Sequence, residues 1–387
     1  MDGYRPYLQD LLQRLRRLRE EAGLSPSDLE ERLILGPGWI SRFESGQSTP
    51  SLGVLLSILQ VLGRNLADLM KGLPARIRDS GFERQICAEQ SRSDLVVHFQ
   101  YADHDANYVL PGATTQQFNH VIKTLRDGLS RLAASDAALT EAIKTDSVAA
   151  AFLEAVRVWP HANPSDLWWF VIYRAYCDPF NHPAQFARLD FSQSWKRTGG
   201  WALEEVLVRH YGPYLKSKGI NLFIAPADVK ERLLRTVKVR ERLEPDKIDV
   251  LLTGNAEGNQ ELFGVVHVKA SFAERRTDDV PMSRALIKAG YTSPLWTMDC
   301  KGTPAAIPVN KGELGAALRR GPDERSAKRK DIERDGYFSA CFSYNANTEP
   351  TLPGRKAKAR ICVCDFNNPE DAFTKFVVES WKQRKRP

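Results

Sequence analysis

Apolar residues recur at helical spacing through the first seventy residues of the chain. Leucines at positions 8, 11, 12, 15 and 18 fall on one side of a helix that Gly23 ends. Ser25 is placed to cap a second helix, with Pro26 at its first position. Apolar-periodic runs at 51–63 and 65–70 follow. The pattern therefore predicts an all-α domain of four or five short helices joined by tight turns, residues 1–74.

The middle of the chain predicts a connecting segment, residues 75–115, and then a helical subdomain, residues 116–195. The connecting segment contains one strand-like run, "RSDLVVHFQY", and a turn, "LPGATTQQ". A period of 3.6 over 116–158 predicts helix that Pro160 stops, and Ser165 is expected to cap the next helix. The aromatic residues of that next helix are expected in the core because they surround it: Trp168, Trp169, Phe170 and Tyr173.

Residues 196–387 combine helical and strand patterns and predict an α/β (α+β) core with a mixed sheet flanked by helices. Leu203, Val206 and Leu207 form the apolar stripe of a helix. A short buried strand begins at Val250, with Asp249 just before it. A second strand, "LFGVVHVKAS", is expected to pair with the first as a hairpin across "TGNAEGNQE".

Composition places this chain of 387 residues among folded proteins of two or three domains, with 42% hydrophobic and 27% charged residues. No apolar run approaches the roughly 18–20 residues that cross a bilayer, and the charged N-terminus has no apolar signal core, so a cytoplasmic location is expected. The six cysteines include no CxxC pair, which argues against a zinc site or a disulfide framework. The net charge of +7 is compatible with nucleic-acid binding without requiring it.

Three charged positions in the second half point to one chemistry. Glu204 lies on the predicted helix, Asp249 at the entry of one strand and Lys269 near the end of the next. Each alone is ordinary: a solvated glutamate, a turn aspartate and a charged strand end. Together they can converge at one end of a sheet, where two carboxylates bind Mg2+ and a lysine orients an attacking water and stabilises negative charge. Glu205 is the alternative helix carboxylate.

The N-terminal residues resemble the Cro/C1-type (XRE) helix-turn-helix family over about residues 10–72. The resemblance rests on the leucines at 24, 29 and 33, "ISRFESG" at 40–46, "TPS" at 49–51 and the ending "LGRNLADLM". It implies DNA contact through the third helix and the residues that follow: Trp39, Ser41, Arg42 and Gln47. The sequence has Pro26 where the family has glutamine and "GPG" at the start of the third helix. A retained helical module for dimerisation or protein contact is the alternative.

The second half resembles the PD-(D/E)XK nucleases. Asp249 stands at the aspartate of the PD motif, preceded by Ile248 in place of proline, and Lys269 stands at the motif lysine. Glu204 matches the helix glutamate in a "GxxLE" pattern at 200–204. The resemblance implies catalytic roles for these three residues, with Glu204, Asp249 and Val268 as metal ligands. The position two before the lysine, usually acidic, is His267.

One branch of this family, the restriction endonucleases that cut sites containing CCGG, also lacks that acid and supplies a carboxylate from elsewhere. The stretch from His267 to Gly302 is similar to its BsaWI-like members, and Glu274 is the candidate for the replacing acid. The resemblance implies base reading by residues of "ERRTDD" and just beyond, namely Arg275, Arg276, Asp278, Asp279 and Arg284. Arginine bonds bidentately to guanine and aspartate accepts from cytosine, which suits G·C pairs. In isolation, "ERRTDD" is also typical of a solvated loop.

These resemblances predict a type II restriction endonuclease, Mg2+-dependent and fused to a helix-turn-helix that adds DNA binding or autoregulation. Its expected partners are double-stranded DNA, a second copy of the chain because a palindromic site calls for a two-fold dimer, and a cognate DNA methyltransferase as a genetic partner. A helix-turn-helix transcriptional regulator with a non-catalytic second half is the first alternative. An inactive nuclease fold kept for binding, motivated by His267, is the second.

Overall fold

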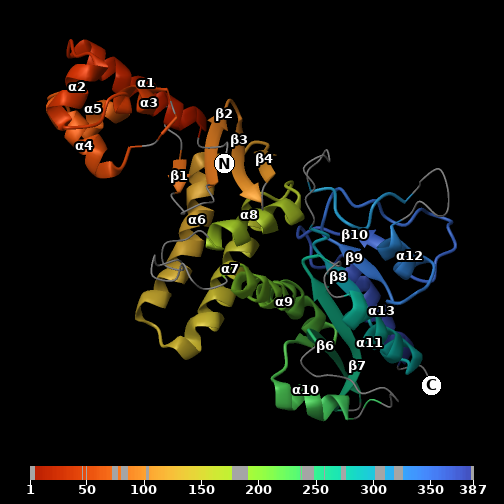
Figure 1. Ribbon diagram of the computed structural model, residues 1–387. Coiled ribbons are helices and arrows are strands. Elements are labelled where there is room, and N and C mark those ends of the chain that lie inside the picture. Colours follow the sequence, from red (N-terminus) through yellow and green to blue (C-terminus); the bar gives the residue numbers. More distant parts are fainter. Residues whose placement is uncertain are drawn as a thin grey trace. The chain divides into compact units, whose positions relative to one another are not determined.

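In the computed structural model the chain forms two compact units, residues 1–76 and 77–387 (Figure 1). No helix among the described residues is both long enough and apolar enough to cross a membrane. The structure describes residues 5–45, 47–48, 50–71, 77–79, 86–101, 104–176, 191–235, 237, 248–256, 258–271, 276–300, 310–317 and 326–384.

The first unit consists of short helices, as the apolar spacing predicts. They are α1 (Arg5–Glu21), α2 (Pro26–Leu33), α3 (Trp39–Glu44), α4 (Leu52–Val61) and α5 (Leu66–Met70). Ser25 caps α2 and forms a reciprocal capping box with Asp28, which confirms the predicted start of that helix. The buried side chain of Glu30 accepts hydrogen bonds from the backbone N–H groups of Gly38 and Ile40, so α2 satisfies the exposed donors at the start of α3.

The second unit opens with an antiparallel sheet where the sequence predicts only a connecting segment with one strand. The sheet has the order β1 (Ile77–Asp79), β2 (Ile86–Ser91), β3 (Asp94–Tyr101) and β4 (His104–Leu110). Only β3 has a run of apolar and β-branched residues; β2 and β4 contain charged and amide side chains that hide their strand character. Pairing with β3 therefore decides their conformation, not their own propensity.

Three helices follow the small sheet: α6 (Thr115–Ser130), α7 (Thr140–Val158) and α8 (Pro164–Tyr176). The four aromatic residues of α8 that were expected in the core are buried, as predicted: Trp168, Trp169, Phe170 and Tyr173. Ser165 is not the N-cap of α8, because it lies within the first turn. Its backbone N–H donates to the carbonyl of Tyr344, and the Asn163 side chain accepts from the same N–H group. The cap prediction was wrong because Pro164, not Ser165, begins the helix.

The main sheet of the second unit has six strands in the order β10-β9-β8-β7-β6-β5. The predicted hairpin is confirmed: β6 (Val250–Ala256) pairs antiparallel with β7 (Asn259–Lys269), with Val250 opposite Val266. Strand β5 (Ile220–Phe223) adds to β6 antiparallel, whereas β8 (Leu295–Thr297), β9 (Cys341–Ser343) and β10 (Ile361–Val363) continue parallel from β7. The start of β6 and the end of β7 therefore lie side by side at one end of these strands.

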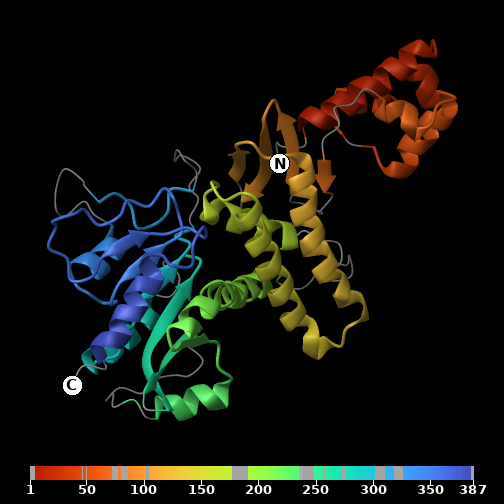
Figure 2. The same cartoon turned by 180° about the vertical axis from the view of Figure 1, so that it is seen from behind.

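Helices cover both faces of this sheet, which confirms the predicted mixed α/β core. Val250 and Val266 pack in one apolar cluster with residues of α9 (Phe191–Ser217) and α13 (Ala372–Arg384), and Figure 2 shows α13 against the strands. Leu251 and Val265 pack on the other face with α10 (Ala227–Leu234) and α11 (Arg276–Lys288). Further along that face, Ile332 of α12 (Ala327–Glu333) packs on β8 and β9. Because side chains alternate along a strand, Asp249 and Lys269 share the α11 face.

Candidate active site

Asp249 and Lys269 form the centre of the site. Asp249 comes just before β6 and Lys269 ends β7, so the antiparallel pairing brings them to the same edge. The Lys269 Nζ lies 2.6 Å from Asp249 Oδ2, and the backbone N–H of Val268 donates to the same oxygen at 2.8 Å. Asp249 is 7% exposed and Lys269 8%. Two opposite charges are thus held together with little water, where their interaction is strong.

Glu204 of α9 belongs to the same site. It is 9% exposed, and its pKa is raised to about 8, first by burial and then by the negative charge of Asp249. The positive charges of Lys230 and Lys269 act in the opposite direction. A carboxyl that responds to both members of the Asp249–Lys269 pair lies within electrostatic reach of them. The alternative carboxylate, Glu205, forms a salt bridge with Arg209 at 3.0 Å and is more exposed.

His267 does not present an acid or a ligand to this centre. It is fully buried, and its Nε2 lies 2.9 Å from the hydroxyl of Ser293. Its Nδ1 lies 3.7 Å from Asp279 Oδ1. The same oxygen of Asp279 is 3.6 Å from Lys269 Nζ. Asp279, in the first turn of α11, therefore brings a carboxylate close to Lys269. His267, two positions before the lysine, carries no carboxylate.

Asp279 differs most from its predicted role. The sequence assigned it to base reading, but it is 2% exposed and lies against Lys269 and His267. The signal for burial was present: Asp279, Ser283 and Leu286 follow each other at four and three residues, and all lie on the buried side of α11. Pro281, inside the helix, concealed that period because proline usually marks a break.

The remaining predicted DNA contacts of the second unit are only partly described. Arg275 and Glu274 lie outside the described residues, as do the side chains of Arg276 and Asp278. Arg284 is exposed on α11, with its guanidinium 4.9 Å from the ring centre of Tyr337. Stacking on a ring holds the planar group in a fixed orientation at the surface. Arg284 is therefore available to a ligand, unlike Asp279.

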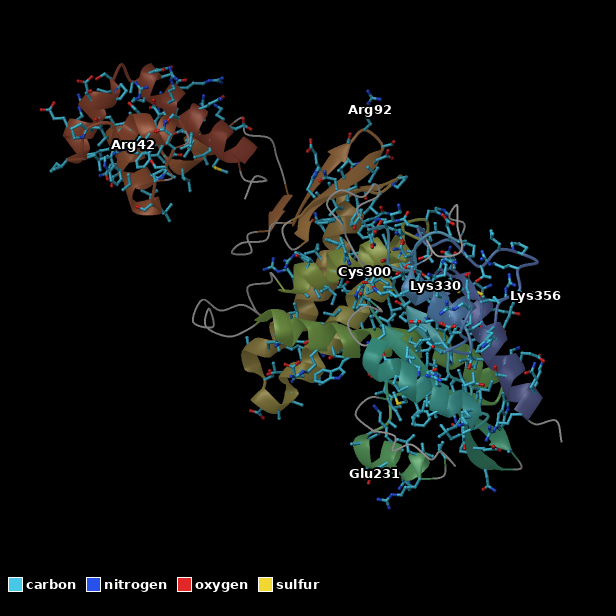
Figure 3. The ribbon with its side chains drawn as sticks, turned by 45° about the vertical axis from the view of Figure 1, so that its right-hand side comes forward. Arg42, Arg92, Glu231, Cys300, Lys330 and Lys356 are labelled. Carbon is cyan, nitrogen blue, oxygen red and sulfur yellow. The ribbon has the colours of Figure 1, made fainter. Side chains whose placement is uncertain are left out.

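The predicted DNA-contact residues of the first unit are exposed: Trp39, Ser41, Arg42 and Gln47. Figure 3 labels Arg42 on this unit, and its guanidinium lies 5.9 Å from the ring centre of Trp39. The buried face of α3 consists of Ile40 and Phe43. The helix thus presents a basic and aromatic face while its apolar face packs in the core.

The oxygen groups of the site fit a hard divalent cation. Two carboxylates lie close enough that the charge of Asp249 raises the pKa of Glu204, and a cation offsets such repulsion. No group of three His, Cys, Asp or Glu side chains suited to a metal is found among the described residues. A metal here would therefore combine two carboxylates with backbone oxygen and water, the ligand set typical of Mg2+. The Val268 backbone N–H donates to Asp249, so the end of β7 adjoins this carboxylate.

The chain is 40% identical over 241 residues to the type II restriction enzyme AgeI of Thalassovita gelatinovora. The matched region covers 60% of this chain and 83% of that enzyme. This chain belongs to the type II restriction endonucleases. The crystal structure of the AgeI–DNA complex matches with a TM-score of 0.60 and 34% identity, over 74% of this chain and 99% of AgeI. A BsaWI–DNA complex matches with 16% identity and a TM-score of 0.35, over 69% of this chain and 94% of BsaWI.

Residues 10–70 match a family described as "Helix-turn-helix domain". This range lies within the first compact unit and includes α3 with its exposed Trp39 and Arg42. This restriction endonuclease therefore has a helix-turn-helix at its N-terminus, preceding the unit that holds Glu204, Asp249, Lys269 and Asp279.

Proposed function

We propose that this protein hydrolyses double-stranded DNA with Mg2+ at a palindromic site containing CCGG. The main support is that two carboxylates and a lysine gather where β6 begins and β7 ends, and that Asp279 Oδ1 lies 3.6 Å from Lys269 Nζ while His267 stands two positions before the lysine. Membership of the type II restriction endonucleases supports DNA as the substrate, since AgeI was crystallised with it. The CCGG element rests on the resemblance to the branch whose members lack the acid two positions before the lysine.

Each residue of the site has a definite role in this proposal. Glu204, Asp249 and the Val268 carbonyl would hold Mg2+, which when bound polarises a phosphoryl oxygen and lowers the pKa of an attacking water. Lys269 orients the water and stabilises the negative charge that develops on the phosphate. Asp279, whose Oδ1 lies 3.6 Å from Lys269 Nζ, holds the lysine together with Asp249 at 2.6 Å. The buried position of these groups excludes bulk water and strengthens each interaction.

The proposed assembly is a homodimer. A palindromic site has two-fold symmetry, so two copies related by a two-fold axis present one active site to each strand. Arg275, Arg276, Asp278 and Arg284 would read bases in the proposal, and Asp279 leaves that group. An enzyme that cuts a short palindrome requires protection of the host's own sites, so we propose a cognate DNA methyltransferase as its genetic partner.

The helix-turn-helix adds DNA binding in this proposal, either at the cleavage site or at the promoter of its own gene. Autoregulation would delay a toxic nuclease until methylation is complete. The exposed basic and aromatic face of α3 supports a DNA contact, because guanidinium groups neutralise phosphates or bond to guanine.

Lys269→Ala tests the catalytic proposal. The wild type incubated with plasmid and Mg2+ should give discrete fragments, whereas Lys269→Ala should lose cleavage by at least about 100-fold and keep its affinity for the same DNA. Lys288→Ala, which removes an exposed lysine from the end of α11, is the control. Cleavage by Lys269→Ala at the wild-type rate would contradict the proposed site. Loss of binding together with cleavage would favour a binding role instead.

A further inference from the structure

The pairing of β6 with β7 stops abruptly at the active site. Residues Val265 and His267 direct their backbone N–H groups to β8, since these donate to the carbonyls of Thr292 and Pro294. The alternate residues of β7, Val266 and Val268, therefore face β6. Val266 is opposite Val250, so continuing the same register by two residues would pair Val268 with Ile248.

That next pair is replaced by two side chains. The Val268 N–H donates to Asp249 Oδ2 at 2.8 Å instead of to the backbone of Ile248. The carbonyl of Ile248, the partner that an extended ladder would use, accepts from the ammonium of Lys230. Because both backbone groups still have partners, the strand end is separated without leaving a buried donor or acceptor unsatisfied.

Helix α10 places Lys230 at this point. Leu234 is buried and packs with Ile248 and Leu251, and Leu233 packs against the same cluster. Residues 230, 233 and 234 share one side of a helix, so the lysine stem follows these leucines toward the start of β6. Glu231, labelled in Figure 3, is exposed on α10 and pairs with Arg235 at 3.0 Å.

We propose that Lys230 is a positioning residue of the active site, which holds the Ile248 carbonyl away from Val268 so that Asp249 takes the Val268 N–H. This inference rests on the proposed nuclease function, because it assigns Asp249 to the metal. Without Lys230, the Ile248 carbonyl competes for the Val268 N–H and releases Asp249 from its fixed orientation.

The test compares full-length wild type with Lys230→Met, Lys230→Arg and Arg232→Met. Lys230→Met keeps the apolar stem and loses the donor, Lys230→Arg keeps a charged donor, and Arg232→Met removes an exposed charge from the same helix. Mn2+ binding is measured by electron paramagnetic resonance of the free ion, with DNA affinity and plasmid cleavage alongside. Thermal unfolding midpoints verify that each variant folds.

Lys230→Met should weaken Mn2+ binding and lower kcat by about 10–100-fold, the usual cost of removing a group that orients a metal ligand. Arg232→Met should have the wild-type KM for DNA and the wild-type affinity for Mn2+. Lys230→Arg should recover most of the Mn2+ affinity and kcat that Lys230→Met loses. If Lys230 acted only as a nearby positive charge, it would repel Mn2+, and its removal would leave Mn2+ binding unchanged or make it tighter. Either result for Lys230→Met would overturn the positioning role. The wild type separates the two proposals: if it neither binds Mn2+ nor cuts DNA, the nuclease function itself fails.

Discussion

Each charged side chain of the site is buried against a neighbour that determines what it can do. Lys269 lies between Asp249 at 2.6 Å and Asp279 at 3.6 Å, so its ammonium is fixed from two sides. His267, which replaces an acid, turns its ring to Ser293 and Asp279. A buried lysine without such partners would lose its proton or destabilise the fold. The two carboxylates therefore keep Lys269 charged at the end of β7, although His267 occupies the motif position that is usually acidic.

Asp279→Asn distinguishes a carboxylate that positions Lys269 from one that reads bases. Cleavage should fall by about 100-fold while DNA affinity and the cleaved sequence stay the same, because the side chain is buried and contacts Lys269. Gel-shift affinity and single-turnover cleavage are the measurements. Asp278→Asn, one residue earlier, is the comparison, and it should weaken DNA binding. If Asp279→Asn instead cleaved at the normal rate with relaxed base preference, Asp279 would belong to the recognition surface.

Helices and strands were predictable where the spacing of their own apolar residues matches the face that packs in the core. The β6–β7 hairpin, the core of α9 and the short helices of the first unit follow from alternation or from a period of 3.6. The strands β2 and β4 were missed because β3 imposes their conformation. Lys230 was not recognised because it becomes part of the site only when α10 packs on the start of β6. Arg329 lies in the basic run "RSAKRKDIERD", whose composition is typical of a solvated surface, yet it is buried and forms a salt bridge with Glu333 at 2.8 Å.

The turn that follows β8 depends on the protonation of one buried carboxyl. Asp299 accepts from the N–H groups of Glu313 and Leu314 and from the hydroxyl of Thr348. Burial nevertheless raises the pKa of Asp299 from its ordinary value of 3.8 to about 6. The folded protein therefore holds this proton more tightly than the unfolded chain. The resulting stabilisation is complete below about pH 4 and is lost as the pH rises through 6.

Asp299→Asn should remove this pH dependence. Asparagine stays neutral, so between about pH 4 and 7 the wild type should lose roughly 3 kcal/mol of unfolding free energy that the variant does not lose. Urea unfolding of both proteins at several pH values measures the difference. Asp365→Asn, at an exposed turn, controls for the loss of an acid. Parallel stability curves for wild type and Asp299→Asn would contradict the raised pKa.

The molecule combines two units with separate apolar cores, and each has its own surface for DNA in the proposal. In this proposal, the nuclease unit recognises and cuts a short palindrome, while the helix-turn-helix contributes affinity or controls expression. Because phosphate contacts dominate non-specific affinity, exposed arginines of the first unit would act over any DNA sequence and more strongly at low salt. In the same proposal, the second unit selects the sequence that is cleaved.

Arg42→Ala in full-length protein tests the contribution of the helix-turn-helix. In a Lys269→Ala background, its affinity for DNA carrying its own promoter should fall several-fold, and the slope of log affinity against log salt should decrease by about one. In the catalytically competent protein, the cleaved sequence should not change. Arg16→Ala is the control, because Arg16 on α1 is already paired with Glu20 at 2.8 Å. If Arg42→Ala, Arg16→Ala and the Lys269→Ala parent bound this DNA with equal affinity, a protein-contact role for the first unit would be favoured.

Sequencing of the DNA ends left by the purified protein tests the central claim most directly. Genomic DNA that lacks the cognate methylation is digested with Mg2+, and all fragment ends are mapped, with Lys269→Ala as the parallel control. The proposal predicts that the ends fall at a single palindromic sequence containing CCGG, that both strands are cut symmetrically, and that Lys269→Ala yields none of them. Ends scattered without a shared sequence, or no ends above the Lys269→Ala background, would contradict a site-specific nuclease.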